Sequence, residues 1–161
     1  TQLMRDLGCM MSPNSAFILN MNMETLPIRM ARHCENALAV AKYLENHPKI
    51  EWVNYPGLQS NKYHELAKKY LPNGCSAVIA YGVKGGKAAA KKFLENLKLA
   101  SLEIHVADIR TCCLHPASTT HRQLTEEQLI GAGIGSDLIR MSVGIENADD
   151  IIEDIKNYVK E

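Results

Sequence analysis

The sequence has no excess of charge of either sign and no long apolar run. Its 18 basic residues are balanced by 18 acidic residues, which argues against nucleic acid or an anionic membrane as a partner. No apolar run approaches the roughly 20 residues that cross a bilayer. The N-terminus also lacks the basic-then-apolar pattern of a secretory signal. We therefore expect a cytoplasmic protein without a membrane partner.

Paired cysteines, repeats and linkers are missing as well. The five cysteines are odd in number and include no CxxC motif, which favours reduced thiols over a disulfide framework. There is no internal repeat, low-complexity tract or Gly/Ser-rich linker. At 161 residues the chain suits one domain, or slightly more, with a sizeable core.

Apolar periodicity predicts alternating helices and strands. From 14 to about 46 the spacing is helical, and Pro27 must interrupt the hydrogen-bond ladder, so we expect two helices or one kinked helix. A capping box at Thr125 and Gln128 marks another helix start. Further patterns predict strands at 51–56, 77–83, 100–106, 111–115 and 138–144, and helices at 63–71, 85–97 and 147–159. The expected fold class is α/β (α+β), a small antiparallel-to-mixed sheet with helices on one face.

The first 24 residues differ from the rest because they are rich in methionine and apolar groups and poor in charge. Such a segment is typical of a surface that packs against another domain or subunit. We therefore expect self-association through residues 1–24. The alternative is an ordinary N-terminal helix in the core.

The stretch "HPASTTH" (115–121) and the cysteines before it allow two kinds of chemistry. Zinc ligands are available at Cys112, Cys113, His115 and His121. Neighbouring strand residues point to opposite faces, however, and His-x5-His matches no structural zinc spacing. We therefore expect no metal ion.

A nucleophilic dyad of Ser118 or Thr120 with His115 or His121 is the second possibility. No Gly-x-Ser-x-Gly elbow accompanies these residues, and His121 is equally explained as a side chain that orders the loop. The turn "GVKGGKA" (82–88) resembles the end of a Walker motif but lacks its first glycine and its final hydroxyl residue. A glycine-requiring strand-to-helix turn explains it without phosphate binding.

Arg140 lies in an apolar strand pattern, "LIRMSVG". A guanidinium in such surroundings is costly unless an anion pairs with it. Its partner is either one of the chain's own acids or a ligand carboxylate, which the guanidinium fork binds through two parallel hydrogen bonds. In the second case, the hydroxyls of 117–121 would supply neutral donors nearby.

The stretches "HPASTTHRQLTEEQL" and "IRMSVGIENADDIIEDI" resemble the C-terminal domain of the pyridoxal-phosphate enzymes of cysteine and methionine metabolism. That group includes cystathionine gamma-synthases, cystathionine and methionine gamma-lyases, and O-acetylhomoserine sulfhydrylases. "METLPIRMARHCENALAVAKYLENHPKIEWVNYPGL" and "HELAKKYLPNGCSAVIAYGVKGG" extend the resemblance over essentially the whole chain. "HPASTTH" is most similar to the O-acetylhomoserine sulfhydrylase branch.

The resemblance implies a fold-type-I enzyme, in which a large domain holds the cofactor on a lysine and a smaller domain closes over the substrate. Residues 31–161 are then the substrate-closing domain, residues 1–30 a helical linker or interface segment, and the cofactor-binding domain is absent from this chain. The implied reaction of the parent enzyme is γ-replacement on an activated homoserine, a small amino-acid substrate. The gamma-lyase and gamma-synthase branches remain alternatives.

The resemblance also assigns substrate-binding residues. Arg140 corresponds to the arginine that binds the substrate α-carboxylate, and Thr120 to a threonine that lines the pocket. His105 occupies a position where relatives have a serine or asparagine that helps to hold the same carboxylate. Ala107 stands where glycine is usual.

No residue of this chain matches the family's cofactor-binding motifs. Its lysines lie on polar helix faces, at helix ends or at a glycine turn, and none has the desolvated setting of a Schiff-base lysine. We therefore expect no catalytic residue, no covalently bound cofactor and no activity in the isolated chain. A stand-alone or fragment domain that serves only as an association or structural module is the alternative from another functional class.

Overall fold

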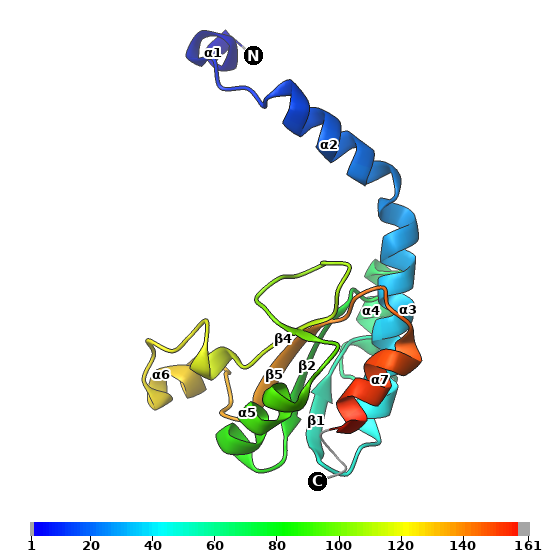
Figure 1. Ribbon diagram of the computed structural model, residues 1–161, viewed down its shortest axis with the longest axis vertical. Coiled ribbons are helices and arrows are strands. Elements are labelled where there is room, and N and C mark those ends of the chain that lie inside the picture. The colour runs from blue at the N-terminus through cyan, green and yellow to red at the C-terminus, as the bar shows by residue number, and fades with distance from the viewer. Residues whose placement is uncertain (1, 158–161) are drawn as a thin grey trace.

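The computed structural model describes residues 2–157 and shows a sheet domain from which a helical arm extends (Figure 1). In chain order the elements are α1 (Gln2–Leu7), α2 (Pro13–Glu24), α3 (Leu26–Glu45), β1 (Ile50–Asn54), α4 (His64–Tyr70), β2 (Val78–Val83), α5 (Gly86–Asn96), β3 (Ser101–Leu102), β4 (Cys112–Leu114), the 3-10 helix η1 (Pro116–Ser118), α6 (Glu126–Gly131), β5 (Leu138–Ser142) and α7 (Ala148–Asn157). No helix in this described range is both long enough and apolar enough to cross a membrane.

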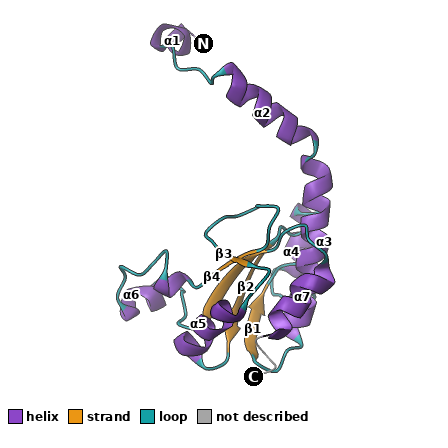
Figure 2. Cartoon of the chain, viewed as in Figure 1, coloured by secondary structure: helices purple, strands orange, loops and turns teal. Residues whose placement is uncertain are grey.

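The five strands form one mixed sheet in the order β1-β2-β5-β4-β3. All neighbouring pairs are antiparallel except β3 and β4, which are parallel. Helices α3, α5 and α7 pack on one face (Figure 2). This face carries the core, with Ile79 and Tyr81 of β2 and Ile139 and Met141 of β5 fully buried. The predicted fold class is confirmed.

The other face of the sheet has no such cover. In β2 and β5 several of the residues that alternate with the core residues are partly exposed, including Val78, Ala80 and Arg140. Because side chains of a strand alternate between faces, the apolar period of these strands places Arg140 on this open face.

Most predicted elements are present with small shifts at their ends. The predicted interruption near Pro27 is confirmed, because α2 ends at Glu24 and α3 begins at Leu26. Proline is tolerated in the first turn of α3, where its missing N–H has no helical acceptor. The capping box is also confirmed, with Thr125 and Gln128 exchanging hydrogen bonds of 2.9 and 3.3 Å. The predicted helix end at 159 lies outside the described residues.

One strand prediction was wrong in extent. The pattern over 100–106 predicts a strand, but β3 contains only Ser101 and Leu102. The chain then leaves the sheet as a loop, 103–111, whose shape depends on side-chain hydrogen bonds rather than on strand pairing.

Buried polar side chains of α3 hold the turn that follows β5. His33 Nδ1 lies 2.7 Å from the carbonyl oxygen of Val143. Asn36 donates to the carbonyl oxygens of Gly144 and Glu146 at 3.0 and 2.7 Å. These contacts satisfy backbone acceptors that would otherwise be buried without partners. They anchor the end of the strand that carries Arg140.

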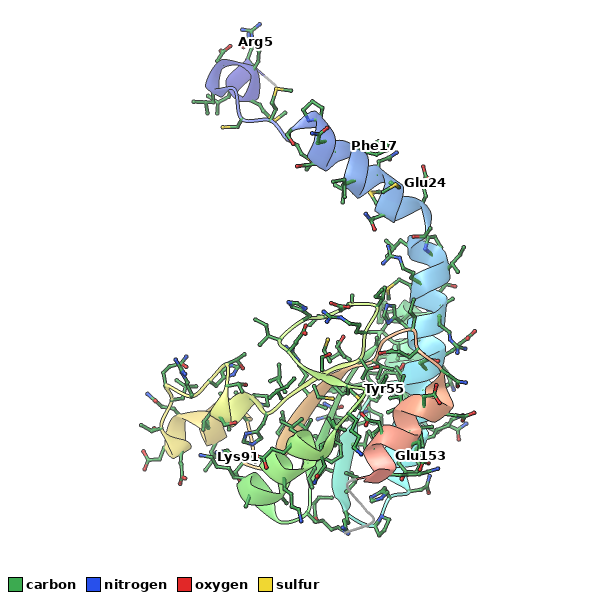
Figure 3. The ribbon with its side chains drawn as sticks, viewed as in Figure 1. Arg5, Phe17, Glu24, Tyr55, Lys91 and Glu153 are labelled. Atoms are coloured by element: carbon green, nitrogen blue, oxygen red, sulfur yellow. The ribbon has the colours of Figure 1, made fainter. Side chains whose placement is uncertain are left out.

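The arm formed by α1 and α2 does not contribute to the core. Every described residue up to position 28 is exposed, including Phe17 at 67% (Figure 3). Phe17, Ile18 and Leu19 are consecutive, so at about 100° per residue they spread over roughly 200° of the circumference of α2. An exposed apolar surface this wide is typical of a helix that packs against more protein than this chain supplies. The alternative of an ordinary core helix is therefore wrong for this structure.

Candidate functional site

Arg140 occupies the middle of β5 on the open face of the sheet, paired across the strands with Ala80 and Leu114. Its Nη2 donates to the carbonyl oxygen of Ile104 at 2.6 Å. Its Nε is buried and has no hydrogen-bond partner. Among the residues that the structure describes, no carboxylate forms an ion pair with it. The guanidinium is thus a half-buried cation that lacks an anion, which is costly unless a ligand supplies one.

His105 is brought close to Arg140 through its backbone rather than its ring. Ile104, whose carbonyl accepts from Arg140, is its neighbour in the chain. The ring of His105 turns to the loop's own acids, with Nδ1 2.9 Å from Glu103 Oε2 and 3.3 Å from Asp108 Oδ2. The side chain is 56% exposed.

Arg110 ties the two ends of this loop together. Its Nη1 and Nη2 donate to the two carboxylate oxygens of Glu103 at 3.2 and 3.1 Å. Nη2 also donates to Asp108 Oδ2 at 3.1 Å. The hydrogen bond from Arg110 holds the pKa of Asp108 well below its usual range, and Asp108 in turn raises the pKa of Arg110. Sequence reasoning missed this network, although the spacing of Asp108 and Arg110 was available as a signal.

The backbone at Ala107 adopts a conformation that favours glycine. Its φ is +61°, in the left-handed region that L side chains rarely adopt. Its N–H donates to Ser142 Oγ at 3.1 Å, which keeps the loop over β5.

Replacing Ala107 by glycine should therefore stabilise the chain by about 0.5–1 kcal/mol, because glycine adopts this φ without a Cβ clash. The measurement is the urea midpoint of unfolding. Ala88→Gly, on the exposed side of α5, should have the opposite sign at about 1 kcal/mol. A lower midpoint for Ala107→Gly would contradict the strain assigned to this residue.

Two of the Ser/Thr–His pairings that the sequence allowed are within hydrogen-bond distance, but their surroundings differ. His115 is fully buried, with Nδ1 2.8 Å from Ser118 Oγ and Nε2 2.9 Å from the carbonyl oxygen of Ser136. Both of its nitrogens are engaged, so it joins η1 to the segment before β5. Thr120 Oγ1 and His121 Nδ1 lie 2.9 Å apart in an exposed turn. No hydrogen bond among the described residues joins Thr120 to Arg140.

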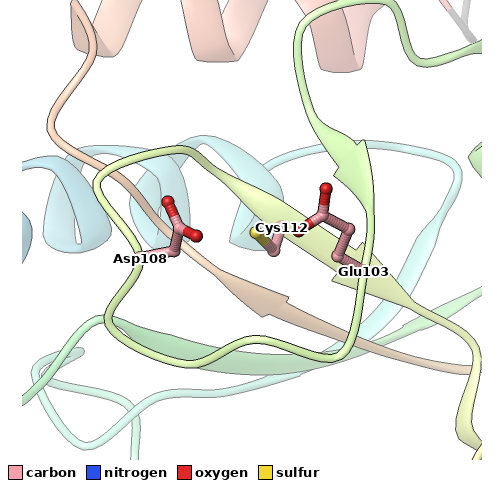
Figure 4. A group of neighbouring side chains, drawn as sticks. All are labelled: Glu103, Asp108 and Cys112. Carbon is pink, nitrogen blue, oxygen red and sulfur yellow. The ribbon is translucent and has the colours of Figure 1, made fainter.

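The described residues bring together one group of metal-ligand types, and it differs from the set considered in the sequence. Glu103, Asp108 and Cys112 meet inside the loop (Figure 4). Both carboxylates already bind the Arg110 cation. Burial raises the pKa of the Cys112 thiol, which opposes the thiolate form that binds metals. The group is therefore an ion-pair network, and we assign no metal to it.

The lysines that the structure describes do not suit covalent attachment of pyridoxal phosphate. None of the lysines in the described residues is buried, whereas a lysine that forms a Schiff base is activated by desolvation or a neighbouring cation. The described part of the chain thus presents a guanidinium suited to a carboxylate, but no lysine suited to the cofactor.

Comparison with known proteins identifies the family of this chain. The family model described as Cys/Met metabolism PLP-dependent enzyme matches residues 1–160. The chain belongs to this family. It is 53% identical over 154 residues to a homocysteine synthase of Schizosaccharomyces pombe, covering 96% of this chain and 36% of that protein. It is 48% identical over 160 residues to an O-acetyl-L-homoserine sulfhydrylase of Leptospira meyeri, covering 99% and 36%.

A solved structure agrees with this family assignment. The crystal structure described as an O-acetylhomoserine (thiol)-lyase of Campylobacter jejuni superposes with a TM-score of 0.88 at 41% identity. It covers 99% of this chain and 38% of that chain, and it carries N'-pyridoxyl-lysine-5'-monophosphate at its own position 205, beyond the segment matched here. The family and fold expected from the sequence are confirmed. The chain spans little more than a third of the length of these relatives.

Proposed function

We propose that this chain is the substrate-closing part of a pyridoxal-phosphate-dependent transferase that carries out γ-replacement on O-acetylhomoserine. The observation that carries the proposal is the half-buried Arg140 guanidinium, which has a buried Nε without a partner and no ion pair among the described residues. A guanidinium binds a carboxylate through two parallel hydrogen bonds. Arg140 then binds the α-carboxylate of the amino acid, with Thr120 and His105 at the edges of its pocket.

The names of the relatives support the sulfhydrylase branch. Two of the similar proteins are a homocysteine synthase and an O-acetyl-L-homoserine sulfhydrylase. An L-methionine gamma-lyase of Fusobacterium nucleatum is also similar, at 46% identity over 149 residues, so elimination is the competing reaction. In this proposal residues 31–161 are the substrate-closing domain and residues 1–30 the helical linker. The cofactor belongs to another part of the protein.

An activity assay of the full-length gene product separates the two reactions. With O-acetylhomoserine and sulfide, a sulfhydrylase forms homocysteine and acetate in equal amounts. With methionine, a gamma-lyase forms methanethiol, ammonia and 2-oxobutanoate. We expect the first reaction to have the higher kcat/KM. A higher value for methionine would assign the chain to the lyase branch instead.

The isolated 161-residue chain provides a second test, which also addresses a purely structural module. After incubation with an equimolar amount of pyridoxal phosphate and reduction with borohydride, its intact mass should show no stoichiometric pyridoxyl adduct. A stoichiometric adduct on a single lysine would contradict the placement of the cofactor in another part of the protein.

We also propose that the arm, residues 1–24, mediates self-association. Its support is the wide exposed apolar surface of α2, where Phe17, Ile18 and Leu19 are each at least half exposed. In light scattering, the isolated chain should have a mass at least twice that of a monomer, and a variant without residues 1–24 should be monomeric. A monomeric intact chain, or an unchanged assembly after truncation, would contradict this role.

A further inference from the structure

We propose that Arg110 is a positioning residue: by holding Glu103 and Asp108 it gives loop 103–111 the shape that orients Arg140 for the substrate carboxylate. The inference rests on the proposed function of Arg140. Arg110 itself does not contact the substrate in this proposal, because its guanidinium is occupied by the two acids.

The orientation of the Arg140 fork depends on the loop. The one hydrogen bond that the guanidinium forms within the described residues is the 2.6 Å bond from Nη2 to Ile104 O. The Nε atom has no partner. A bidentate contact with a carboxylate requires the plane of the guanidinium to be set in advance. The position of the Ile104 carbonyl therefore decides how the fork meets its ligand.

Apolar packing does not hold the loop in place. Ile104, Val106 and Ile109 are 62%, 56% and 53% exposed, so their side chains contribute little burial. The loop is instead fixed by polar contacts. Its far end is held by the Ile145 N–H to Ile109 O and by Thr111 to the Glu146 carboxylate. Nearer Arg140 it is held by the Ala107 N–H to Ser142 Oγ and by the Arg110 contacts with Glu103 and Asp108. Since Glu103 directly precedes Ile104, the bidentate contact with Arg110 fixes the residue next to the carbonyl that orients Arg140.

Arg110 also keeps the loop's negative charges away from Arg140. Its guanidinium binds both carboxylates, and its hydrogen bond lowers the pKa of Asp108, so this pair persists at a lower pH than an ordinary aspartate would allow. Without Arg110, the carboxylates of Glu103 and Asp108 would lose their cation and would repel one another. Glu103 directly precedes Ile104, whose carbonyl accepts from Arg140, so a Glu103 carboxylate without Arg110 would be free to turn toward the Arg140 guanidinium and compete with the substrate.

A double-mutant cycle on the full-length enzyme tests this coupling. The variants are Arg110→Gln, Arg140→Gln and the combination, with KM for the amino-acid substrate and kcat measured for each. Arg110→Gln should raise KM roughly tenfold while kcat changes by less than about threefold. If Arg110 acts through Arg140, it should have no further effect on KM once Arg140 is replaced. Arg110→Lys keeps the charge but loses the two-pronged guanidinium contact, so its KM should lie between those of the wild type and Arg110→Gln.

The outcomes separate the inference from the function on which it rests. No change in KM for Arg140→Gln would remove the proposed carboxylate site itself. A raised KM for Arg140→Gln with an unchanged KM for Arg110→Gln overturns only the inference. Independent, multiplying effects on KM also overturn it, because a general loss of stability would act in either background.

If Arg110→Gln does not fold, Arg110→Lys takes its place in the cycle. Lys91→Gln is the charge-matched control, because Lys91 is exposed on α5, which packs on the face of the sheet opposite Arg140 (Figure 3).

Discussion

Replacing Arg140 by glutamine in the full-length enzyme should raise KM for the amino-acid substrate by roughly 30- to 1,000-fold. The loss corresponds to about 2–4 kcal/mol of binding, the range for removing one partner of a desolvated, charge-assisted contact. Glutamine is shorter and uncharged, so it cannot form the two parallel N–H···O bonds of a guanidinium fork. The measurement is steady-state kinetics with the acid substrate varied.

Two controls distinguish carboxylate binding from a general defect. Arg140→Lys retains the charge without the fork and should fall between the wild type and Arg140→Gln. An amide analogue that lacks the substrate's carboxylate should bind the wild type and the glutamine variant with similar, weak affinity. An unchanged KM in Arg140→Gln would show that the guanidinium does not bind the acid group.

Replacing Asp154 by alanine should destabilise the chain by about 3–5 kcal/mol. Asp154 lies on α7, is 4% exposed, and accepts hydrogen bonds from the backbone N–H groups of Lys98, Leu99 and Ala100 at 2.7, 3.0 and 2.9 Å. Alanine leaves these donors without their acceptor in the turn between α5 and β3. The free energy of unfolding in urea reports the loss.

The amide variant and a surface variant calibrate this effect. Asp154→Asn keeps one acceptor oxygen and should lose about half as much stability as alanine. Asp150→Ala, an exposed residue on the same helix, should change the unfolding free energy by less than about 1 kcal/mol. Similar losses for Asp150→Ala and Asp154→Ala would show that helix propensity, rather than the buried contacts, controls the result.

Local patterns predicted the regular elements well because the forces that form them act over a few residues. The helical spacing of α3 and the capping box at Thr125 involve partners at most four positions apart. The apolar strand around Arg140 also made that residue visible as an exception, since a cation among apolar neighbours needs a partner. The pattern left open whether this partner was an internal acid.

The loop after β3 shows where local patterns fail. Leu102, Ile104 and Val106 alternate with polar residues as in a strand. In the structure, the chain instead leaves the sheet after Leu102. In the loop that follows, Arg110 binds Glu103, and Arg140, 36 positions further along the chain, donates to the Ile104 carbonyl. Neither contact leaves a periodic pattern of apolar residues in the sequence. The direction of the His105 ring, toward Glu103 and Asp108, follows from the same loop.

The order of residues alone was sufficient for the family, the fold class and the candidate Arg140, because motifs and apolar periods are properties of adjacent positions. The tertiary structure decided three further features. The Arg140 guanidinium binds the Ile104 carbonyl, Arg110 binds Glu103 and Asp108, and the whole arm is exposed. The Arg140 contact joins residues 36 positions apart, so it forms only when the sheet brings β5 beside β4 and the loop across its open face. The Arg110 contacts span only seven and two positions, but they follow no apolar period. The exposure of the arm depends on how the rest of the described chain packs without it.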